Sequence, residues 1–162
     1  YQRDAAITMG KELATQRGHT LLRIEAKPSF ANLLLWKTVY ETQKQFFVDA
    51  VRPGFSKRVF VGSSIDKLNI PKDFYWLDPN SQQAKDIERF RWFSQGYLAQ
   101  DPVNPNNIID VRYSMIPNEI AALWSIELSQ TAQLKAHVQF LTHRGNVSEQ
   151  MDKLWGMVFG NP

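Results

Sequence analysis

The chain has 162 residues, of which 43% are hydrophobic, 12% aromatic and 22% charged, and its formal net charge is +3. A chain of this length and composition forms a globular domain with a buried core, so a disordered chain is excluded. The absence of cysteine excludes disulfide partners, thiolate zinc sites and thiol nucleophiles. No apolar run has the length of a membrane-spanning helix. The sequence starts at Tyr1 rather than at methionine, and we expect a fragment of a longer protein.

The first part of the chain predicts a helix followed by an antiparallel meander. Ala6, Met9 and Leu13 recur at helical spacing, and Gly18 is a typical helix stop. Apolar and charged residues then alternate, as they do in half-buried strands, and a polar turn at 42–44 joins two of these strands. The expected elements are a helix over residues 3–17, a strand from residue 22 that ends near Pro28, and strands over 33–41, 45–51 and 58–62.

The second part predicts two more helices and three more strands. A loop over 66–80 leads to a helix that Asn80 or Ser81 caps and Gly96 closes. Asn146 begins the last helix. The expected strands cover residues 109–115, 122–128 and 136–142. The fold class is therefore α+β, a single domain over residues 1–162 with three helices packed on a mainly antiparallel sheet of about six or seven strands.

Two segments, residues 86–96 and 110–119, mix ionised side chains with large apolar ones. This pattern predicts carboxylate–guanidinium pairs that are partly buried beside aromatic rings. On a helix, Asp86 and Arg89 are three residues apart and face each other, as do Glu88 and Arg91. The candidate polar cluster comprises Asp86, Glu88, Arg89, Arg91, Asp110, Arg112 and Glu119. We favour a structural network between the second helix and residues 110–112, and the alternative is an acid–base pair.

Other chemistry has weaker support. His137 and His143 are too far apart on one strand to share a metal, and neither they nor His19 predicts a metal site or a catalytic residue. The cations of residues 52–58 are too few for a nucleic-acid interface. A solvated turn is the favoured interpretation of that segment, and contact with anionic lipid headgroups is the alternative.

Three segments together resemble a known family. They are KPSFANLLLWKTVY at residues 27–40, DIERFRWFSQGYLA at 86–99 and DVRYSMIPNEIAALWSIEL at 110–128. In order and spacing they are similar to the C-terminal part of bacterial membrane-bound metal-dependent hydrolases, also described as LexA-binding inner-membrane hydrolases. The positions that match the recurrent pattern are Pro28, Asn32, Trp36, Asp86, Arg89, Trp92, Phe93, Asp110, Arg112, Tyr113, Pro117, Asn118, Glu119 and Trp124.

The resemblance implies a division of labour within a longer protein. In such proteins the ligands of a divalent metal lie in an N-terminal, membrane-embedded part, which is absent from these 162 residues. No catalytic residue, metal ligand or cofactor is therefore carried over to this chain. The implied partner is the protein's own membrane-embedded region, and the implied location is the bacterial inner membrane, with this soluble domain expected on the cytoplasmic side.

Three functional hypotheses follow. The leading one is an accessory domain that acts in substrate access, regulation or partner binding, with an unidentified ligand. The second is a hydrolase in its own right, in which Asp110, Arg112 and Glu119 act beside Asp86 and Arg89 in a cleft. The third, a contact with nucleic acid or with a LexA-type regulator, ranks last because the chain has no basic helix or aromatic platform.

Overall fold

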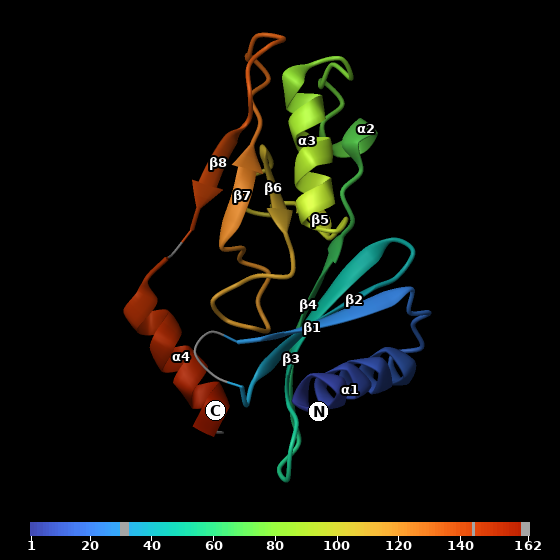
Figure 1. Ribbon diagram of the computed structural model, residues 1–162, viewed down its shortest axis with the longest axis vertical. Helices are drawn as coiled ribbons and strands as arrows, with labels where there is room; N and C mark the ends of the chain where they lie inside the picture. Colours follow the sequence, from blue (N-terminus) through green and yellow to red (C-terminus); the bar gives the residue numbers. More distant parts are fainter. Residues whose placement is uncertain (30–32, 144, 160–162) are drawn as a thin grey trace. The chain divides into compact units, whose positions relative to one another are not determined.

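A computed structural model describes residues 1–29, 33–143 and 145–159. It is an α+β structure in which the described residues form four helices and two four-stranded sheets (Figure 1). The helices are α1 (Gln2–Gln16), α2 (Ile70–Asp73), α3 (Gln82–Phe93) and α4 (Val147–Phe159). The strands are β1 (Arg23–Pro28), β2 (Trp36–Glu41), β3 (Gln45–Arg52), β4 (Arg58–Asp66), β5 (Leu98–Gln100), β6 (Asn107–Asp110), β7 (Trp124–Glu127) and β8 (Gln139–Thr142).

The chain divides into two compact units. The first unit comprises Tyr1–Ile65, Val111–Leu123 and Arg144–Pro162, and the second comprises Asp66–Asp110 and Trp124–His143. The α+β class and the antiparallel pairing are confirmed. The strands form two sheets of four, where the sequence predicts one sheet of six or seven, and there is one helix more than the three expected.

In the first unit the strands follow one another in the order β1-β2-β3-β4. The polar turn between β2 and β3 sets their register, so that Val39 lies opposite Val48. Helix α1 covers the face that carries Ala26, Trp36 and Val51. It contacts that face with small residues spaced four apart, Ala6, Gly10 and Ala14, all of which are buried. A Cβ added to Gly10 would lie 2.5 Å from Ile24 Cδ1, so the helix sits close to the sheet.

The opposite face of the first sheet has a separate apolar cluster. Helix α4 contributes Leu154, Met157 and Val158, which pack with Leu35 and Ala50 of the sheet region and with Ile116. Asn146 accepts a hydrogen bond from the Glu149 amide, which is the predicted start of this helix.

In the second unit helix α3 packs on the sheet β5-β6-β7-β8. Ser81 caps the helix by accepting a hydrogen bond from the Ala84 amide, as the sequence predicts. Gln95 and Gly96, with φ of 53° and 78°, end it in the left-handed region. The core contains Ile87 and Phe90 of the helix with strand residues; its buried members are Phe74, Ile87, Phe90, Leu98, Ile108, Ile126, Leu128 and Val138.

Some predicted boundaries are wrong. The strand expected over 109–115 is β6, which ends at Asp110, and beyond it Ser114 forms only an isolated bridge with Ala122. Alternation of apolar and polar residues indicates that successive side chains point to opposite sides of an extended segment, but it does not show that another strand pairs with that segment. Strand β5 has three residues, too few to show a period, and the loop expected over 66–80 contains α2, which Asn69 caps.

Candidate functional site

The helix-covered face of the first sheet contains a buried polar network around Asp49, here called the Asp49 network. The Arg17 guanidinium donates to both carboxylate oxygens of Asp49, at 2.7 and 2.8 Å, and the Gly62 amide donates to Oδ1 at 3.0 Å. Arg17 also donates to the Tyr40 hydroxyl at 3.2 Å, and His19 Nδ1 lies 2.7 Å from that hydroxyl. Asp49 is 1% exposed and Tyr40 is fully buried. The network therefore joins the end of α1 to three strands.

The charges in this network stabilise each other. The hydrogen bond to Asp49 raises the pKa of Arg17 above its ordinary value, although burial opposes this. Burial raises the pKa of Tyr40, and the hydrogen bond from Arg17 opposes that shift. Because Arg17 donates to the hydroxyl oxygen, the Tyr40 proton can point to His19 Nδ1. Tyr40 has no exposed surface through which a substrate could reach it, so the arrangement serves to hold α1 on the sheet.

The opposite face of the same sheet contains a buried lysine beside a serine. Lys37 is 3% exposed, and its Nζ donates to Ser114 Oγ at 2.8 Å and to the Glu119 carbonyl at 2.9 Å. The Ser114 hydroxyl donates to the Ile116 carbonyl at 2.7 Å. A serine nucleophile requires a neutral base that accepts its proton. Here the lysine is the donor and the serine proton points to the backbone, so this geometry holds residues 114–119 on the sheet.

Two residues of the predicted cluster lie in this first unit. Arg112 is 5% exposed, with a guanidinium nitrogen 3.8 Å from the Glu25 carboxylate, and its guanidinium carbon lies 5.1 Å from the centre of the Tyr113 ring. This agrees with the predicted guanidinium buried beside an aromatic ring. Glu119 is paired with Lys153 of α4. The two side chains thus contribute to separate contacts.

The second unit holds Asp86, which is 7% exposed. Its carboxylate accepts hydrogen bonds from Gln82 Nε2 at 2.9 Å and from the Val138 amide at 3.1 Å, and it lies 2.9 Å from His137 Nδ1. Burial is the largest effect on the pKa of Asp86 and would raise it. The hydrogen bonds from Gln82, His137 and Val138 together outweigh burial, so that the pKa is lowered.

The remaining members of the predicted cluster lie apart from one another. The predicted pair of Glu88 with Arg91 is present at 3.2 Å on the exposed side of α3. Arg89 is exposed, and the ion pair predicted for it with Asp86 is replaced by the contact of Asp86 with His137. Asp110 is buried at the end of β6 in the second unit, whereas Arg112 belongs to the first. Asn32, which matches the family pattern, lies outside the described residues.

Sequence reasoning missed the Asp49 network and the contact of Asp86 with His137. Their partners are far apart in the chain, by 32 residues for Arg17 and Asp49 and by 51 for Asp86 and His137. A usable signal for the first is that Asp49 interrupts the apolar stretch of β3. A charged residue at such a position indicates a buried partner, although it does not identify the partner.

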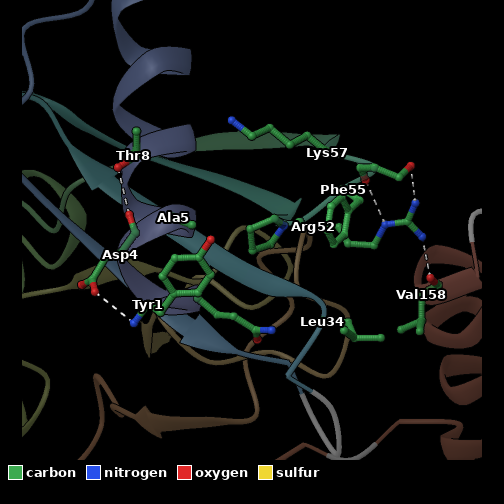
Figure 2. Close-up of a pocket in the computed structure, with 13 residues that line it drawn as sticks. Tyr1, Asp4, Ala5, Thr8, Leu34, Arg52, Phe55, Lys57 and Val158 are labelled. Atoms are coloured by element: carbon green, nitrogen blue, oxygen red, sulfur yellow. Dashed lines mark hydrogen bonds and ion pairs between the residues drawn. The ribbon is translucent and has the colours of Figure 1, made fainter.

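A cavity of about 980 Å³ lies in the first unit beside the turn between β3 and β4 (Figure 2). It is lined by Tyr1, Gln2, Asp4, Ala5, Thr8, Leu34, Arg52, Pro53, Gly54, Phe55, Ser56, Lys57 and Val158. The Arg52 guanidinium braces the turn, because it donates to the carbonyls of Ser56 and Val158 at 3.4 and 2.7 Å and to Ser56 Oγ at 3.2 Å. The cavity is thus formed by one end of α1 and by a basic turn with an exposed aromatic ring.

The described residues contain no group of three or more histidine, aspartate or glutamate side chains placed to hold a metal ion. Within the same residues, no helix combines the length and apolar character needed to cross a membrane. Comparison of the chain with protein-family models, with curated proteins and with solved structures found no match.

Proposed function

We propose that this chain is an accessory domain of a larger membrane-bound metal-dependent hydrolase, in which the metal site lies in another part of the protein. The sequence resemblance over residues 27–40, 86–99 and 110–128 is the origin of the proposal. The described residues offer no ligand set that fits a divalent metal, so the proposal assigns them no step of metal chemistry.

The observation that supports an accessory role most directly is that ionised side chains of the predicted cluster are held by structural contacts. Asp86 receives three donors, Glu119 pairs with Lys153, and Arg112 lies against Glu25 and an aromatic ring. Each of these partners belongs to the same unit as the group it satisfies. Side chains held in this way stabilise packing, and structural ion-pair networks of this kind are common in proteins without catalysis.

A self-contained hydrolase is the second candidate. It would use the pair of Lys37 Nζ and Ser114 Oγ, which lie 2.8 Å apart, since a serine can be activated by a neighbouring lysine that has lost its proton. This requires the Ser114 hydroxyl to turn from the Ile116 carbonyl to Lys37 Nζ. The acidic version of this candidate relies on Asp110 and Glu119, which belong to different units.

A hydrolysis screen compares the full-length protein with this chain alone. Phosphoester and carboxyester substrates are tested with Zn²⁺ or Mn²⁺ and after chelation. Metal-dependent activity of the full-length protein, with none in this chain, is the expected result. Activity of this chain alone that Ser114→Ala or Glu119→Gln abolishes, and that the exposed-site control Glu88→Gln retains, would overturn the accessory role.

A further inference from the structure

The turn between β3 and β4 exposes apolar surface. It projects at the bottom of Figure 1, and Gly54, with a φ of 126°, allows the chain to reverse there. Phe55 at the turn is fully exposed, with 116% of the reference area. Leu34, which lines the same cavity, is 50% exposed. Single exposed apolar residues are common, but an aromatic ring and a leucine around one cavity form a patch.

The same turn is positively charged. Residues 50–65 contain Arg52, Lys57 and Arg58 and no carboxylate, so this stretch around the turn carries +3. Arg52 is held by the bonds that brace the turn. Lys57 is exposed and lines the cavity, and it forms no ion pair with any described residue. A cation without a partner is therefore available two residues from the exposed ring.

We propose that the β3–β4 turn docks on a membrane surface that contains anionic phospholipid. Phe55 enters the boundary between headgroups and acyl chains, and Lys57 contacts lipid phosphate. Basic side chains beside aromatic and aliphatic ones are the combination that binds this interface. Three cations on one short turn are too few to follow a nucleic-acid backbone, whereas they match a charged surface that the apolar tip can enter.

The inference goes beyond the proposed function, because it needs no catalytic activity and no metal. Each cation near an anionic bilayer strengthens binding about fivefold, and this attraction weakens as salt increases. Burial of a phenylalanine ring strengthens binding about tenfold or more. The two contributions are separable by substitution, since both side chains are exposed and neither belongs to the two apolar clusters described above for the first unit.

The test is sedimentation of the chain with vesicles, either of phosphatidylcholine alone or of equal parts of phosphatidylcholine and phosphatidylglycerol. We expect binding to the anionic vesicles that decreases with salt. Phe55→Ala is expected to weaken it about tenfold, and Lys57→Glu at least as much. The matched controls are Tyr75→Ala, at a 79% exposed aromatic residue, and Lys85→Glu, at an exposed lysine. They are expected to stay within about twofold of the unmodified chain.

Several outcomes would overturn the proposal. One is failure of the unmodified chain to sediment with anionic vesicles at low salt. Another is equal losses in the control variants, which would indicate nonspecific attraction of a basic protein. Equal binding to neutral vesicles would exclude the role of Lys57. Tighter binding to a duplex oligonucleotide at the same salt concentration, lost in Lys57→Glu, would assign the turn to nucleic acid instead.

Discussion

Replacement of Asp49 by alanine is predicted to destabilise the first unit strongly. The substitution removes the carboxylate that accepts from the Gly62 amide and from the Arg17 guanidinium, whose side chain is 25% exposed and which keeps only the Tyr40 hydroxyl as an acceptor. Removal of one partner of a buried ion pair costs about 3–5 kcal/mol. Partial exposure of Arg17 puts the expected loss near the lower limit, at about 3 kcal/mol. For a chain of this length that corresponds to a decrease in Tm of about 6–12 °C.

Urea denaturation followed by circular dichroism measures this loss. Glu88→Ala is the control, because it removes a carboxylate from an exposed pair and should cost less than about 0.5 kcal/mol. A double-mutant cycle with Arg17→Met isolates the contact between the two side chains, with an expected coupling above about 1 kcal/mol. A loss for Asp49→Ala equal to that of the control, or a coupling below about 0.5 kcal/mol, would refute the reasoning.

Three further predictions concern other contacts. Gly62→Ala places a Cβ 2.0 Å from the Val48 carbonyl oxygen, so we expect the free energy of unfolding, measured by urea denaturation, to decrease by about 3 kcal/mol or more. The control is Gly54→Ala, where the added Cβ lies in open space and only backbone strain is introduced, at a cost of about 1 kcal/mol. Asp86→Asn should destabilise by about 1–3 kcal/mol at neutral pH. The folded-state pKa of Asp86 is below its ordinary value of 3.8. The difference in stability between the unmodified chain and Asp86→Asn should therefore be complete above pH 3.8 and disappear as the pH falls through the folded-state pKa. Denaturation measured over a range of pH checks this. Lys37→Met should cost about 1–3 kcal/mol in thermal denaturation, because it leaves two acceptors unsatisfied.

Local chemistry made parts of the fold predictable. The cap at Ser81, the turn between β2 and β3 and the pair of Glu88 with Arg91 each depend on residues within a few positions of one another. Such contacts are encoded by neighbouring side chains, so the sequence alone identifies them. The same holds for α1, which helical spacing predicts, and for α4, which follows the predicted cap at Asn146.

The division of the chain into two units could not be predicted from neighbouring residues in this way. Residues 111–115 continue an alternating pattern from β6, yet they belong to the first unit. The choice of His137 rather than Arg89 as the partner of Asp86 depends on a segment 51 residues away. Local spacing favours the arginine, and only the packing of β8 and its preceding loop against α3 brings the histidine to the carboxylate.

The small residues on α1 affect how easily this helix detaches from the first sheet. Ala6, Gly10 and Ala14 let the helix approach the sheet closely, but side chains of this size bury little apolar area. Attachment of the helix therefore depends on Met9, with Ile7 and Leu13 packed beside it, and on the bond of Arg17 to Asp49 near its last turn. Detachment of α1 leaves every strand pair of the sheet intact, so it is an opening of lower free energy than unfolding of the unit. We therefore expect a protease to cut the segment between Gly18 and Leu22 when the helix detaches.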